Sequence, residues 1–215
     1  MRHGGQRQNG HGVSRWIRGG TAVALCLGAA LVLPFTPGIV QAGAPPCPLY
    51  YSFEMPPVLT GFEMDDKQNQ YTVYTGLLRG TLGGLPVEKA TIMLRPGVST
   101  GAGGGNFTLQ TTAGAVANGL VLMTTDKQVT SLWFSGTYLG ARLAFHVSGP
   151  AKDFGAAAYA GKGLADTSFA DNNAYLAAVT QAVANLAPAA RAEALAGADR
   201  NLGLVSAYQQ ETGTP

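Results

Sequence analysis

Residues 71–147 read YTVYTGLLRGTLGGLPVEKATIMLRPGVSTGAGGGNFTLQTTAGAVANGLVLMTTDKQVTSLWFSGTYLGARLAFHV. Along this segment β-branched and aromatic residues alternate with small or polar ones, and Gly, Pro and Asn separate the runs. Alternation with a period of two residues is typical of β-strands that bury one face. The segment therefore predicts six strands, over residues 71–81, 86–94, 106–111, 119–124, 129–135 and 141–147.

The links between these strands are short and rich in glycine, as in Leu82–Leu85 and Tyr138–Gly140. None of them could hold the helix that a parallel crossover needs, so consecutive strands should pair as antiparallel hairpins. A meander with one apolar face must close on itself or be covered. We therefore predict a mainly β fold: a small antiparallel β-barrel over residues 70–149, with an open antiparallel sheet as the alternative.

Residues 1–42 have the pattern of a secretory signal peptide. Four arginines and no acidic residue precede an apolar run at residues 21–33, and Val40-Gln41-Ala42 is a small-x-small cleavage pattern. The alternative is an uncleaved membrane anchor, because residues 21–40 approach the roughly 20 residues that span a bilayer. Pro34 and Pro37 favour cleavage. We expect a secreted or cell-envelope protein that contacts a membrane only if this segment is retained.

The charge balance after Ala42 argues against nucleic-acid binding. All 12 acidic residues but only 10 of the 14 basic residues follow that position, so the remaining chain carries 10 minus 12, or −2. A protein that neutralises phosphates needs an excess of Lys and Arg. We predict no nucleic-acid partner.

Residues 43–69 are a proline-rich lead-in, within which Tyr50–Phe53 could add an edge strand. This segment holds Cys47, which is the only cysteine left if residues 1–42 are removed. No intramolecular disulfide is then possible. The Cys47 thiol would stay free or form a disulfide with a second chain.

The segment after the strands changes to an alanine-rich composition. Residues 150–170 have the small-residue composition of a linker, and residues 171–211 predict two helices. Asp171 or Asn172 can cap the first helix, and Pro188 suits the first turn of the second. The short connection favours an antiparallel helix pair, which could lie over a barrel end or bind a partner.

The candidate site residues are His146, Arg142, Trp133, Tyr138 and Tyr74. His146 is the only histidine after Ala42, and alternation places it with Arg142 on one face of its strand. If that face lines a pocket, the two side chains could orient a ligand or move a proton; otherwise they form a polar surface. The three aromatic residues could line an apolar cavity or fill the core.

We predict no metal and no cofactor. Glu63, Asp65 and Asp66 form the only acidic cluster, but the spacing and the invariant glycine of an EF-hand loop are absent. His146 alone cannot build a site with several histidine ligands.

Three functions remain open from the sequence. The first is an exported, non-enzymatic protein that holds a small apolar ligand in its barrel. The second is a pocket-type isomerase or cyclase that uses His146 and Arg142. The third is a structural or interaction module of the cell envelope, in which Cys47 or the C-terminal helices hold a partner.

Overall fold

A computed structural model describes residues 46–64, 70–96, 102–151 and 156–214 of the 215-residue chain. The predicted signal peptide, Asp65 and Asp66 lie outside the described residues. The described residues form β1 (Leu49–Met55), β2 (Leu59–Met64), β3 (Gln70–Gly76), β4 (Arg79–Leu82), β5 (Leu85–Pro96), β6 (Ala102–Thr111), β7 (Val116–Asp126), β8 (Val129–Tyr138), β9 (Ala141–Pro150), β10 (Tyr159–Thr167), α1 (Asn172–Ala182) and α2 (Pro188–Thr212).

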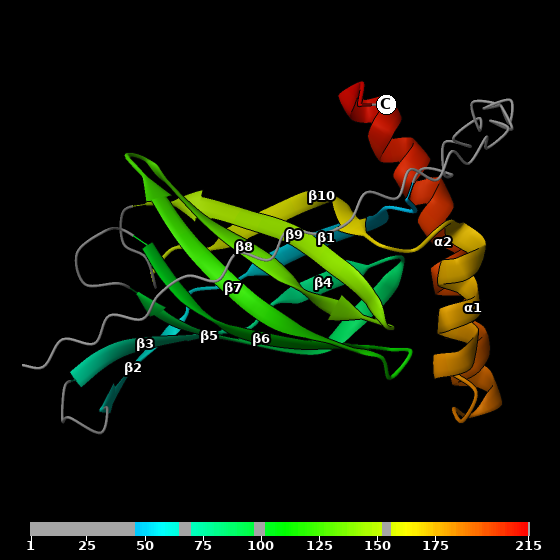
Figure 1. Ribbon diagram of the computed structural model, residues 1–215, viewed down its shortest axis with the longest axis horizontal. Coiled ribbons are helices and arrows are strands. Elements are labelled where there is room, and N and C mark those ends of the chain that lie inside the picture. Colours follow the sequence, from blue (N-terminus) through cyan, green and yellow to red (C-terminus); the bar gives the residue numbers. More distant parts are fainter. Residues whose placement is uncertain (1–45, 65–69, 97–101, 152–155, 215) are drawn as a thin grey trace, which may run out of the picture. The chain divides into compact units, whose positions relative to one another are not determined.

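Eight of the strands form a closed antiparallel barrel. Their order around it is β5-β4-β1-β10-β9-β8-β7-β6, and β6 pairs again with β5. Figure 1 shows the strands curving around a common interior. The predicted class, a small antiparallel barrel followed by two helices, is confirmed.

Large side chains fill the barrel interior. Along β9, Leu143, Phe145 and Val147 are buried, whereas Arg142 and His146, on the opposite face of the strand, are exposed. The ring of Phe145 stacks on Phe134 of β8, with 4.6 Å between ring centroids and 5° between planes. Phe53 and Phe107 also contact this ring, at 4.9 and 6.0 Å. An eight-stranded barrel is just wide enough for such filling, so this level of the interior is core.

The β2–β3 hairpin continues beyond the barrel (Figure 1). β1 ends at Met55, directly before two prolines that cannot donate ladder hydrogen bonds. β3 then pairs with the second half of β5, and β2 pairs with β3 alone. Leu59, Phe62 and Met64 of β2 are consequently exposed.

Helices α1 and α2 lie at one end of the barrel (Figure 1). Asp171 caps α1 by accepting a hydrogen bond from Ala174 N at 2.8 Å, and Pro188 opens α2, as the sequence predicts. Tyr175 of α1 is buried and donates to the Gly83 carbonyl oxygen at 2.7 Å. Asn201 of α2 is buried and accepts a hydrogen bond from Tyr50 N at 3.0 Å. Among the described residues, neither helix is long and apolar enough to cross a membrane.

The strands differ from the expectation in four places, the first of which is β2, a strand that was not predicted within the proline-rich lead-in. β1 is not an edge strand, because it pairs with β10 on one side and β4 on the other. The first predicted strand, residues 71–81, divides into β3 and β4 around Leu77 and Leu78. β10 occupies part of the predicted linker. Its glycines lie where a side chain would meet neighbouring strands, such as Gly161 against the His146 carbonyl oxygen, so the usual alternating pattern is missing.

Candidate functional site

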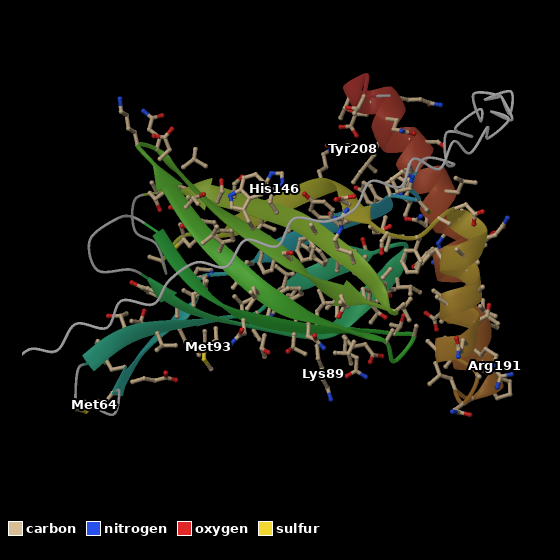
Figure 2. The ribbon with its side chains drawn as sticks, viewed as in Figure 1. Met64, Lys89, Met93, His146, Arg191 and Tyr208 are labelled. Atoms are coloured by element: carbon tan, nitrogen blue, oxygen red, sulfur yellow. The ribbon has the colours of Figure 1, made fainter. Side chains whose placement is uncertain are left out.

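A groove of about 570 Å³ lies on the outer face of β8, β9 and β10, beside the C-terminal end of α2. His146 of β9 and Tyr208 of α2 belong to its lining, and Figure 2 labels both. Its volume falls within the range of small-molecule sites, about 300–1,000 Å³. The lining residues are Tyr51, Trp133, Phe134, Ser135, Ala144, Phe145, His146, Lys162, Gly163, Leu164, Asp166, Tyr208 and Thr214.

Trp133 and His146 form a stacked aromatic pair in the groove. They are directly opposite each other in the β8–β9 ladder, and their rings stack with 4.8 Å between centroids and 24° between planes. The indole nitrogen of Trp133 donates to Thr124 Oγ1 on β7 at 3.1 Å. Contacts on two neighbouring strands therefore fix the indole, although 49% of Trp133 stays exposed.

The groove lies over a register shift between β9 and β10. The two strands pair at Ala160 and again at Asp166, but β10 has more residues between these positions than β9 has opposite them. Here the Tyr51 hydroxyl, from β1, donates to the His146 carbonyl oxygen at 2.9 Å and lies 3.5 Å from His146 Nδ1. A side chain at Gly163 would meet the Tyr51 hydroxyl and ring at 3.2–3.4 Å. Tyr51 is thus one of the lining residues of the groove, although only 2% of it is exposed.

Burial raises the pKa of the Tyr51 hydroxyl above the ordinary tyrosine value, so the group stays protonated at neutral pH and well into the alkaline range. Tyr51 therefore contributes a neutral hydroxyl to the groove.

Two ion pairs flank the groove. Lys162 Nζ lies 2.7 Å from Glu211 Oε1 of α2, and Arg142 lies 3.0 Å from the Asp166 carboxylate. The hydrogen bond and charge of Glu211 raise the pKa of Lys162, so the ammonium stays charged. All four side chains are more than half exposed.

The predicted site residues separate into two groups. Trp133 and His146 line the groove together, and Arg142 adjoins it through Asp166. Arg142 and His146 share the outward face of β9, and Trp133 lies opposite His146 on the outward face of β8. Tyr138 is instead buried near α1, beside Thr111 Oγ1 at 3.3 Å, and Tyr74 on β3 packs against the hydrophobic core.

Of the lining residues, only Trp133 and His146 were predicted; Tyr51, Lys162 and Tyr208 are among those that the sequence did not indicate. Tyr51 lies in the proline-rich lead-in, Lys162 in the apparent linker, and Tyr208 near the end of the second helix. The aromatic pair Tyr50 and Tyr51 was the one available signal, since aromatic residues favour strands. Nothing in the local pattern connects these three positions with residues 133–146.

The described residues contain no group of three His, Cys, Asp or Glu side chains that could hold a metal ion. Comparisons of the chain with known protein families, with curated proteins and with solved structures find no match. The groove must therefore be interpreted from its own chemistry.

Proposed function

We propose that this protein binds a small, mainly apolar molecule in the groove over Trp133 and His146, without transforming it. The observation that carries the proposal is the half-exposed Trp133 ring, held in place by His146 and Thr124 inside a concave surface. Exposed aromatic rings that are already ordered bind ring-containing ligands at a low entropic cost.

The outside of the barrel suits this role better than the inside. The rings of Phe53, Phe107, Phe134 and Phe145 pack against one another within the barrel, so a ligand there would have to displace core side chains. On the outer face, a ligand displaces only water from the groove. We accordingly place the ligand against the barrel wall.

Binding without catalysis is the better-supported proposal. An enzyme that combines His146 with Arg142 needs both side chains at one substrate, but the Arg142 guanidinium is engaged with Asp166. Arg142 is also not among the residues that line the groove. His146 alone suits ring stacking and hydrogen bonding.

Export to the cell envelope or beyond remains part of the proposal. Its support is the arginine-rich start, apolar run and small-x-small motif of residues 1–42. A protein outside the cytoplasm that binds a small apolar molecule could carry or sequester it.

Native mass spectrometry of protein purified from its own exported fraction tests this proposal. We expect a non-covalently bound small molecule on the parent protein and its loss from Trp133→Ala. Met93→Ala is the matched control, because Met93 is an exposed apolar residue on β5 that does not line the groove. Retention of the molecule by Trp133→Ala, or a bare parent protein, contradicts the proposal.

A further inference from the structure

We infer that the groove selects an uncharged ligand that carries a flat ring and a hydrogen-bond donor, such as a hydroxyl or N–H group. This inference rests on the binding function proposed above and specifies the chemical class of the ligand.

The ion pairs at the groove favour an uncharged ligand. Lys162 is matched by Glu211, and Asp166 is matched by Arg142, so the charges of these four side chains cancel. An anionic ligand has to share Lys162 with Glu211, and a cationic ligand has to share Asp166 with Arg142. Because a charged ligand must also lose its own hydration, this shared attraction does not favour it over an uncharged one.

The orientation of Trp133 favours a ligand with a flat ring. Its N–H edge is directed at Thr124 Oγ1, and one face stacks with the His146 ring. What remains accessible is apolar indole surface on a rigid support, since 49% of the residue is exposed. Offset stacking on such a surface favours planar ligands over branched aliphatic ones.

The Tyr51 hydroxyl favours a ligand that carries a hydrogen-bond donor. Its only hydroxyl proton is committed to the His146 carbonyl oxygen at 2.9 Å. With that proton used, the Tyr51 oxygen can act only as an acceptor, for which His146 Nδ1 at 3.5 Å and a ligand donor compete. A ligand with a hydroxyl or N–H group satisfies this oxygen, whereas a ligand that brings only an acceptor does not.

A series of naphthalene probes separates these requirements. Equilibrium dialysis of the full chain would compare 2-naphthol, 2-methoxynaphthalene, naphthalene-2-sulfonate and 2-naphthylmethylammonium. We expect 2-naphthol to bind at least about fivefold more tightly than each of the other three, which corresponds to the loss of one hydrogen bond or the desolvation of one charge. Its affinity should not change between roughly 50 and 500 mM NaCl, because no ion pair forms.

Three variants assign the preference to named atoms. Tyr51→Phe should bring 2-naphthol and 2-methoxynaphthalene to equal affinity. Gly163→Ala should do the same with the hydroxyl still present, because the added methyl group lies against it. Glu211→Gln frees Lys162 and should tighten naphthalene-2-sulfonate binding without a change for 2-naphthol.

The outcomes distinguish this inference from the proposed function. If no probe binds in a way that Trp133→Ala abolishes, the binding function itself is wrong. If the probes bind through Trp133 but a charged probe binds as tightly as 2-naphthol, or the methyl ether does so, the function stands and the inferred ligand class is overturned.

Discussion

The Tyr51 hydroxyl donates to the His146 carbonyl oxygen at 2.9 Å, across the place where β9 and β10 fall out of register. A residue from the first strand thus completes the wall between the last two strands. The same contact places the Tyr51 oxygen at the groove. Tyr51 therefore both closes the barrel wall and offers a hydrogen-bonding group to the site.

Removing this hydroxyl should weaken the barrel. We expect Tyr51→Phe to lower the free energy of unfolding by about 1 to 2 kcal/mol, the usual cost when a partly buried acceptor loses its donor. Urea denaturation measures the change. Tyr50→Phe is the matched control, because it removes a hydroxyl from the adjacent residue, whose contact with Tyr208 involves the ring. Equal losses in the two variants would contradict the role of Tyr51.

The turn between β4 and β5 should be far less tolerant than a turn of the same backbone conformation elsewhere. Gly84 and Gly140 both have left-handed φ angles, +80° and +79°. A methyl group at Gly84 would lie 2.0 Å from the Gly197 carbonyl oxygen of α2, whereas at Gly140 it would meet open space. We expect the free energy of unfolding to fall by about 1 kcal/mol in Gly140→Ala and by about 2 to 4 kcal/mol in Gly84→Ala.

Chemical denaturation of both variants tests this difference. Similar losses in the two proteins would mean that α2 does not hold the turn. Any excess loss in Gly84→Ala measures how firmly the helices are fixed to the end of the barrel.

Stability should fall steeply in alkaline solution. Burial raises the pKa of Tyr138 to about 12. The folded state favours the neutral phenol. Tyr138 therefore contributes fully to stability below the unfolded pKa of about 10, and this contribution is lost as the pH rises toward 12. Tyr138 alone should lose on the order of 2 to 3 kcal/mol across that interval. Burial also raises the pKa of Tyr175, so its effect has the same sign.

Urea denaturation at several values from about pH 9 to pH 11.5 measures this loss. Tyr138→Phe should flatten the upper part of the profile, with Tyr208→Phe on α2 as the control. A profile of unchanged slope in Tyr138→Phe would contradict the assignment.

Cys47 should react slowly while the protein is folded. The residue is only 7% exposed, and burial together with the charge of Asp171 raises the pKa of its thiol. We expect Ellman's reagent to modify it on the order of 100-fold more slowly in buffer than in urea. A Cys26→Ser protein makes Cys47 the only thiol. Rapid modification without denaturant would support the alternative of a disulfide between chains, since that also needs an accessible sulfur.

The barrel and its helices could be predicted where the sequence is locally consistent. Alternation in residues 141–147 correctly separates Phe145 from His146, and Asp171 and Pro188 mark the helix starts. β10 could not be found in this way, because Gly161, packed against β9, and Gly163, beside Tyr51 of β1, interrupt the alternating pattern. Its strand character depends on pairing partners distant in the sequence.

The candidate site was only partly predictable for a related reason. Alternation places His146 on one face of its strand but does not say which face is outside. The groove also depends on a register shift between β9 and β10, and on Tyr51, 95 residues before His146. Only the assembled barrel brings these features together.

The pairing of β1 with β10 also constrains how the chain folds. Leu49 lies opposite Ala165, so β1, the first strand of the chain, cannot complete its pairing until β10, the last strand, is present. Such distant pairing is entropically costly and slow to form. A polypeptide that stops before Tyr159 leaves β1 and β9 with unpaired backbone edges, which invite association between chains. We therefore expect the barrel to close only when β10 pairs with β1, and a product truncated before Tyr159 to aggregate instead of forming a smaller barrel.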